Sequence, residues 1–157
     1  MKIAVCGKGG VGKTTFAALL AHCLAENGRE VYAIDADVNP TLAEALGLSA
    51  EEAAAIIPIV EMKELIGERT GAKSGEYGTY FTSTPRVQDV PGRYSRRIGG
   101  INFLRMGAML GADQGCACAE NAMLKALVTH LILKEEEDVI MDMVAGTEHM
   151  GRGTAKG

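Results

Sequence analysis

A glycine-rich loop near the start of the chain restricts the possible folds more than any other feature. The residues Gly7-Lys8-Gly9-Gly10-Val11-Gly12-Lys13-Thr14 fit the pattern G-x-x-x-x-G-K-[ST]. They follow a short apolar run over residues 2–6 and precede apolar residues at helical spacing, so we expect a strand before the loop and a helix after it. This context predicts a phosphate-binding loop, in which glycine N–H groups converge on phosphate oxygens at a helix N-terminus.

The residue types of the loop predict a bound nucleoside triphosphate with Mg²⁺. We expect the Lys13 ammonium to neutralise charge on the terminal phosphates and the Thr14 hydroxyl to reach the metal. The residues expected to contact the nucleotide are Gly9, Gly10, Val11, Gly12, Lys13, Thr14 and Thr15.

Strands alternate with helices along the rest of the chain. Further strands are expected at residues 31–35, 101–106 and 139–142, and helices at 41–48, through Met62, Leu65 and Ile66, and at 120–133. Ser49 and Glu52 have the spacing of a capping box, and a short strand is expected at 79–82. The alternation predicts an α/β fold with a mainly parallel sheet flanked by helices on both faces.

The apolar spacing also predicts which side chains are buried. On the first helix the expected core residues are Phe16, Leu19, Leu20, Cys23 and Leu24. On the helix at 120–133 they are Ala122, Leu124, Leu127, Val128, Leu131 and Ile132. Cys6, in the first strand, and Cys23 are both expected to be buried thiols.

Composition limits the function classes. The chain has 157 residues, 16 Lys+Arg against 20 Asp+Glu, and a formal net charge of −4, which argues against non-specific nucleic-acid binding. Apolar runs are shorter than the roughly 20 residues of a membrane span, and no secretory signal precedes the first strand. We expect one cytoplasmic domain over residues 1–157. The glycine-rich loop at 143–157 lacks the return strand that would fix it, so we expect the chain to be truncated.

Three aspartates are candidates for holding Mg²⁺ and the attacking water. Asp35 and Asp37 end the second strand and Asp142 ends the last one, so all three converge on the phosphate loop if the strands are parallel. Each is also compatible with an ordinary cap or turn aspartate. Together with the loop they favour hydrolysis.

Lys8 follows the first glycine directly, and the stretch Lys-Gly-Gly-Val-Gly-Lys-Thr resembles the deviant phosphate loop of the MinD, ParA and nitrogenase iron protein class of P-loop NTPases. The resemblance implies that Lys8 crosses a two-fold axis and touches the nucleotide of a second copy. A charge supplied in this way stabilises transition-state phosphate charge only in a closed dimer. The other interpretation of Lys8 is a solvated loop lysine.

Cys116 and Cys118 form a CxC pair before the helix at 120–133, where a positive helix end favours thiolates. A closed soft-metal site usually has four ligands, and two copies of the pair across a dimer axis would supply them. Four thiolates accept Zn²⁺ or Ni²⁺. A chance pair of small cysteines is the alternative.

The chain as a whole resembles the CooC family, ATPases that assist nickel insertion into carbon monoxide dehydrogenase. The residues that carry the resemblance are Gly7 to Thr15, Ile34-Asp35-Ala36-Asp37 with Asn39-Pro40, Gly115-Cys116-Ala117-Cys118 with Glu120-Asn121, and Asp142 to His149 with Gly151 to Ala155. The resemblance implies a homodimer that binds and hydrolyses Mg-ATP to ADP, with carbon monoxide dehydrogenase as client and Ni²⁺ or Zn²⁺ at Cys116 and Cys118. It also implies that Asp37 lies near the attacking water, that Asp142 holds the water shell of Mg²⁺, and that the family chain continues beyond Gly157.

Two other functions stay open. One is a redox ATPase with a dimer-bridging iron–sulfur cluster, although Glu148-His149 stand where that class has its second cluster cysteine. The other is a nucleotide-binding module of the MinD/ParA type that does not hydrolyse ATP. Five arginines between residues 85 and 105 form either a docking face for an acidic client or a solvated loop.

Overall fold

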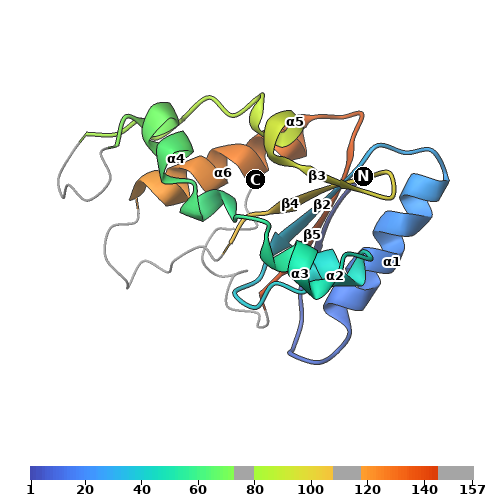
Figure 1. Ribbon diagram of the computed structural model, residues 1–157. Helices are drawn as coiled ribbons and strands as arrows, with labels where there is room; N and C mark the ends of the chain where they lie inside the picture. Colours follow the sequence, from blue (N-terminus) through green and yellow to red (C-terminus); the bar gives the residue numbers. More distant parts are fainter. Residues whose placement is uncertain (73–79, 108–117, 145–157) are drawn as a thin grey trace.

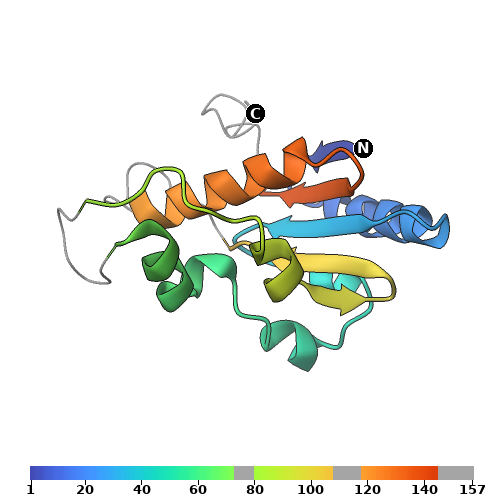
Figure 2. The same ribbon diagram turned by 90° about the horizontal axis from the view of Figure 1, so that it is seen from above.

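The computed structural model describes residues 1–72, 80–107 and 118–144. Within these residues, one sheet has the strand order β1-β5-β2-β4-β3 (Figures 1 and 2). The strands are β1 (Lys2–Val5), β2 (Val31–Ala36), β3 (Arg96–Ile98), β4 (Ile101–Arg105) and β5 (Asp138–Met143). All neighbouring strands pair in parallel except β3, which pairs with β4 in the antiparallel sense. The predicted α/β fold with a mainly parallel sheet is confirmed.

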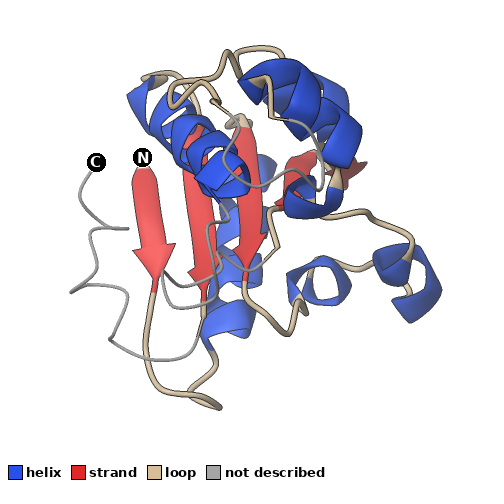
Figure 3. Ribbon diagram, turned by 90° about the vertical axis from the view of Figure 1, so that its left-hand side faces the viewer, coloured by secondary structure: helices blue, strands red, loops and turns tan. Residues whose placement is uncertain are grey.

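The parallel register brings the carboxyl ends of the central strands together. β2 lies between β5 and β4, with Asp35 opposite Asp142 on one side and Arg105 on the other. Figure 3 shows the parallel strands pointing toward the same edge of the sheet. Polar residues that end different strands therefore become neighbours at this edge.

Helices cover both faces of the sheet (Figure 1). On one face, α1 (Lys13–Glu26), α2 (Leu42–Ala45) and α3 (Ala50–Ala54) pack on alternate residues of β2 that include Val31 and Ala33. On the other face, α4 (Lys63–Thr70), α5 (Val90–Tyr94), α6 (Cys118–Leu133) and the 3₁₀ turn η1 (Ile59–Glu61) surround Tyr32 and Ile34. β2 is buried from Val31 to Asp35, as expected for a central parallel strand.

Several element boundaries differ from the prediction. The helix expected at 41–48 is shorter and consists of α2 alone. The helix expected through Met62 is interrupted, because α3 ends before Pro58 and the turn η1 separates α3 from α4. The strand expected at 79–82 is wrong for residues 80–82, which are not in a strand, and Thr79 lies outside the described residues. The capping box is confirmed: Glu52 N donates to Ser49 Oγ at 3.2 Å, and Ser49 N donates to Glu52 Oε2 at 3.1 Å.

Sequence periodicity did not predict α5 and β3. The α5 segment reads VPGRY, in which Pro91 and Gly92 are poor indicators of a helix. Val90 and Pro91 are buried, so packing of this turn in the core stabilises it. β3 has only three residues and lies at the edge of the sheet, where it is held by pairing with β4.

The predicted buried face of α1 is wrong for three of its five residues, Phe16, Leu19 and Cys23. Phe16 is 56% exposed and Leu19 65%, and the thiols of Cys6 and Cys23 are both exposed. The fully buried residues of this helix are instead three alanines, Ala17, Ala18 and Ala21, while Leu20 and Leu24 pack at the margin of the core. Small side chains let the helix approach the sheet closely, so the larger ones on the other side of the helix point away from it.

The core residues of α6 are mostly those predicted. Leu124, Leu127 and Leu131 are fully buried, together with Met123, which the sequence analysis did not include. Ile132 is 39% exposed, so its predicted core position is wrong. Among the described helices, none is long and apolar enough to span a membrane.

The arginines between residues 85 and 105 do not share one surface. Arg105 is buried at 9% exposure, whereas Arg96 and Arg97 are exposed on the edge strand β3. Arg93 Nη1 donates to Asp89 Oδ2 at 3.3 Å. A single docking face formed by all five arginines is therefore wrong.

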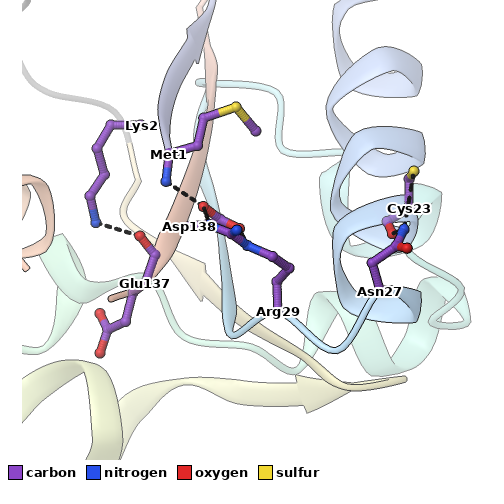
Figure 4. Close-up of polar contacts among 7 residues, drawn as sticks. All are labelled: Met1, Lys2, Cys23, Asn27, Arg29, Glu137 and Asp138. Atoms are coloured by element: carbon purple, nitrogen blue, oxygen red, sulfur yellow. Dashed lines mark hydrogen bonds and ion pairs between the residues drawn. The ribbon is translucent and has the colours of Figure 1, made fainter. Parts of the chain in front are cut away.

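An ion-pair cluster fixes the amino-terminal end of the parallel strands. Asp138 is fully buried and accepts hydrogen bonds from the Met1 amine and from Arg29 Nε at 2.5 Å and Nη2 at 2.8 Å (Figure 4). The bonds from Arg29 hold the pKa of Asp138 below its usual value. Beside it, Lys2 Nζ donates to the Glu137 carbonyl at 2.8 Å. These contacts lie at the opposite end of β5 from Asp142.

Candidate functional site

Gly10 and Gly12, two of the three positive-φ glycines in the loop between β1 and α1, adopt backbone conformations that only glycine adopts readily. Gly10 has φ 78° and Gly12 has φ 88°. No atom lies within 4 Å of a Cβ placed at either position, so backbone conformation rather than crowding requires glycine there. The loop thus has the left-handed turns by which successive N–H groups can surround an anion.

The N-terminus of α1 has the properties of a phosphate-binding helix end. Its N-cap residue, Gly12, has no side chain to accept a hydrogen bond from the first N–H groups. The first turn contains no acidic residue and begins with Lys13. The free N–H groups, the helix dipole and the lysine together favour an anion at this position.

Thr14 and Asp142 join α1 to the end of β5. The Thr14 hydroxyl donates a 2.6 Å hydrogen bond to Oδ2 of Asp142, which is 1% exposed. The other carboxylate oxygen, Oδ1, is buried and has no hydrogen-bond partner among the residues that the structure describes. Burial raises the pKa of Asp142, whereas the Thr14 bond and the Lys13 charge lower it and the charge of Asp37 raises it further.

This arrangement fits Mg²⁺. The ion prefers oxygen ligands and keeps several waters, and here a hydroxyl and a carboxylate with an unpaired oxygen lie together beside a phosphate loop. A cation would also compensate the buried negative charge of Asp142. Thr14 and Asp142 are therefore the residues that would hold the metal and its water shell.

The two aspartates at the carboxyl end of β2, Asp35 within the strand and Asp37 directly after it, make different contacts. Asp35 is 1% exposed, and its oxygens accept hydrogen bonds from the backbone N–H groups of Asp37 at 3.2 Å and Leu42 at 3.1 Å. Burial raises the pKa of Asp35, and the two backbone bonds oppose this rise. Asp37 is half-buried, and its Oδ1 accepts a 2.9 Å bond from the backbone N–H of Asn39.

The other predicted nucleotide contacts lie around this centre. Lys13 is half-buried on the first turn of α1, and Thr15 follows Thr14 on the same turn. Five consecutive loop residues are exposed: Lys8, Gly9, Gly10, Val11 and Gly12. An exposed Lys8 is compatible with the predicted contact to a second copy and with the solvated alternative.

The predicted metal ligands are only partly within the described residues. Cys118 is the first residue of α6, but its side chain and the whole of Cys116 lie outside the described part of the chain. Glu148 and His149 also lie outside it. In the described ranges, no group of three or more His, Cys, Asp or Glu side chains is arranged to hold a metal ion.

A cleft of about 620 Å³ connects the nucleotide side of the molecule with α6. Asp37 lies on one side of it, and Glu120 of the first turn of α6 also lines it. Arg105 lines the same cleft, donates from Nη1 to the Ile56 carbonyl at 3.2 Å, and has a buried Nε without a partner. Arg105 was not predicted as a site residue. Its position at the carboxyl end of a parallel strand is the feature of the sequence that could have indicated it.

The comparisons with known proteins agree with this geometry. The model of the CobQ/CobB/MinD/ParA nucleotide binding domain matches residues 2–151. The chain is 48% identical over 154 residues to the carbon monoxide dehydrogenase accessory protein CooC of Rhodospirillum rubrum. It is 46% identical over 154 residues to an uncharacterized ATP-binding protein of Methanocaldococcus jannaschii and 34% identical over 158 residues to another from the same organism.

These matches cover nearly all of this chain but only part of each relative. They include 98% of the chain and 58% of the first two relatives, and 100% of the chain and 63% of the third. The family model, in contrast, matches residues from β1 through β5. The chain belongs to the CobQ/CobB/MinD/ParA nucleotide binding domain family.

Proposed function

We propose that this chain is the nucleotide-binding part of an Mg-ATP-dependent, dimerising ATPase that binds nickel or zinc and assists nickel insertion into carbon monoxide dehydrogenase. The observation that carries the nucleotide part is the Thr14–Asp142 hydrogen bond beside a glycine loop, with Asp142 Oδ1 unpaired. The similarity to the accessory protein CooC of R. rubrum supports the client.

The described residues divide the phosphate chemistry among themselves. The N-terminus of α1 and Lys13 bind phosphate charge, and Thr14 and Asp142 orient the metal. Bound Mg²⁺ supplies charge neutralisation on the phosphate oxygens. Asp37 orients the attacking water through its carboxylate, whose Oδ1 also accepts the Asn39 N–H.

Lys8 is the proposed link between turnover and dimerisation. It is exposed on the loop between β1 and α1. In a two-fold dimer it would place a positive charge on the phosphates of the other copy, where such a charge accelerates phosphoryl transfer.

Cys116 and Cys118 are the proposed ligands of the transported metal, with two thiolates from each copy. The CxC pair immediately precedes or begins α6, and Glu120 of the same helix lines the cleft that contains Asp37. Movement of the Asp37 segment during turnover would therefore alter the surroundings of the cysteine-bearing helix end. We propose this as the route by which hydrolysis releases the metal.

The metal part of the proposal is tested by elemental analysis of the purified chain after incubation with Ni²⁺ or Zn²⁺. We expect one ion per two chains, and loss of this ion in the double variant Cys116→Ser/Cys118→Ser. The matched control is Cys6→Ser/Cys23→Ser, which removes two exposed thiols elsewhere and should keep the ion. Equal metal contents in the two double variants would exclude the CxC pair as the ligand set.

The nucleotide part is tested by phosphate release and by size exclusion with a non-hydrolysable ATP analogue. We expect a dimer that requires nucleotide and a loss of phosphate release in Lys8→Ala, with Lys125→Ala on the exposed side of α6 as control. Binding without phosphate release in the unchanged chain would favour the non-hydrolysing module. Iron and sulfide in the isolated protein, with visible absorbance, would favour the redox ATPase.

A further inference from the structure

We infer that Asp35 is a positioning residue that fixes the segment carrying Asp37, rather than a direct ligand of the nucleotide or its metal. This inference deepens the proposed function and rests on it for the role of Asp37. Asp35 is 1% exposed at the end of the central strand β2. Burying a carboxylate there is costly unless its oxygens are paired, so the identity of its partners indicates its role.

Both partners of Asp35 are backbone groups of the segment that follows it. One oxygen accepts from Asp37 N–H at 3.2 Å and the other from Leu42 N–H at 3.1 Å. The carboxylate therefore holds the segment at two points, one at Asp37 and one at the start of α2. Neither oxygen needs a metal or a nucleotide to be satisfied.

The bond to Leu42 replaces a missing helix cap. Leu42 is the first residue of α2, and the N-cap residue Thr41 makes no capping hydrogen bond with its side chain. The Leu42 N–H would otherwise have no partner within the helix. Asp35 supplies this acceptor from seven residues upstream.

Helix α2 in turn connects the segment to the phosphate loop. Leu42 and Ala43 are fully buried in the same core cluster as Ala17 and Ala21 of α1. Asp35 holds both ends of the segment from Asp37 to Leu42, and the Leu42 end also packs on α1, the helix that follows the loop. Asp35 thus sets the position of the Asp37 carboxylate relative to the nucleotide side.

An aspartate suits this position better than an asparagine. An asparagine has one acceptor oxygen, and its NH₂ group would face one of the two N–H donors and leave it unpaired. Asp35→Asn therefore keeps the shape of the side chain but releases one of the two attachment points. The released segment then samples positions in which Asp37 is misplaced, and small misplacements reduce catalysis more than binding.

Hydrogen exchange measured by NMR on the nucleotide-free chain tests the attachment directly. In the unchanged protein the Leu42 amide should be protected, although it is the first residue of its helix. In Asp35→Asn its exchange should become about tenfold faster relative to the Ile34 amide in the centre of β2, which corrects for any global loss of stability. The matched control is Asp138→Asn, the same change at a buried carboxylate at the other end of the sheet, which should leave this ratio unchanged.

Steady-state kinetics test the positioning role. For Asp35→Asn we expect kcat to fall about tenfold and KM for Mg-ATP to change less than about threefold, while Asp138→Asn keeps kcat. Three results would overturn the inference. The first is a Leu42 amide that exchanges freely in the unchanged protein, and the second is an unchanged kcat in Asp35→Asn although its Leu42 amide exchanges faster. The third is a loss of Mg-ATP binding in Asp35→Asn as large as that in a Thr14 variant. If the unchanged chain hydrolyses no ATP, the proposed function fails, and the exchange ratio alone decides whether Asp35 holds the segment.

Discussion

Thr14 Oγ1 and Asp142 Oδ2 lie 2.6 Å apart, although 128 positions separate the two residues in the chain. The bond links the first turn of α1 to the end of β5 and leaves Oδ1 of Asp142 buried and unpaired. It is the contact at which the phosphate loop and the carboxylate edge of the sheet meet. The metal-dependent part of nucleotide binding should depend on it.

Thr14→Ala should weaken the binding of Mg-ATP about 10- to 100-fold but leave ATP binding in the presence of EDTA nearly unchanged. The variant removes the hydroxyl that reaches the metal and orients Asp142, whereas the loop N–H groups and Lys13 remain. Isothermal calorimetry with and without Mg²⁺ measures both affinities. Thr14→Ser keeps the hydroxyl and is the control, and equal Mg²⁺ dependence in the two variants would contradict the assignment.

Asp142→Asn should raise the free energy of unfolding at pH 7 by about 1 kcal/mol while abolishing the Mg²⁺ dependence of nucleotide binding. Burial raises the pKa of Asp142 in the folded protein, so its ionised form opposes folding. The stabilisation from such a group is fully present below its unfolded-state pKa and is lost as the pH rises through the higher folded-state pKa. Urea unfolding at pH 7 checks the gain, and a less stable variant would contradict it.

Asp138 should show the opposite pH dependence. Its pKa is lowered by the Arg29 bonds, so its contribution is present above the unfolded value of 3.8 and is lost as the pH falls through the lower folded value. Asp138→Asn should lower the free energy of unfolding at pH 7 by about 2 kcal/mol. The substitution removes the buried negative charge that pairs with Arg29. Urea unfolding from pH 7 to pH 2 should show the difference from the unchanged protein shrinking only below about pH 4.

Gly12→Ala should reduce nucleotide affinity with a modest loss of stability. No atom lies near the added methyl group, but φ 88° is unfavourable for alanine by about 1–2 kcal/mol. The loop can relieve the strain by changing its backbone, which moves the N–H groups at the start of α1. Gly92→Ala is the control, since its Cβ also meets nothing within 4 Å and its φ is not positive. Thermal unfolding and nucleotide titration of both variants measure the difference.

Substitution of a buried leucine on α6 should lower the free energy of unfolding far more than substitution of an exposed leucine on α1. Leu127→Ala on α6 should cost about 2–5 kcal/mol, because this side chain is fully buried. Leu19→Ser on α1 should change the free energy of unfolding by less than about 0.5 kcal/mol, since Leu19 is 65% exposed. Urea unfolding compares the two, and a large cost for Leu19→Ser would contradict the position of α1.

Local patterns in the amino-acid sequence were enough to predict the phosphate loop, its place between a strand and a helix, and the parallel α/β architecture. These features depend on local patterns: glycines at positive φ, apolar runs of strand length, and helical spacing. The position of Asp35 opposite Asp142 also followed from the sequence, because parallel strands end at one edge.

Only the tertiary structure decided which side of α1 is buried and what Asp35 and Arg105 contact. Both the alanine side of α1 and the side with Phe16 and Leu19 are apolar. The alanine side is the buried one, because small side chains let the helix lie close to the sheet. Asp35 and Asp37 are the same residue type two positions apart. Asp35 accepts hydrogen bonds from backbone N–H groups, whereas Asp37 lines the cleft. Such differences arise from contacts between segments that are distant in the chain, which no local pattern records.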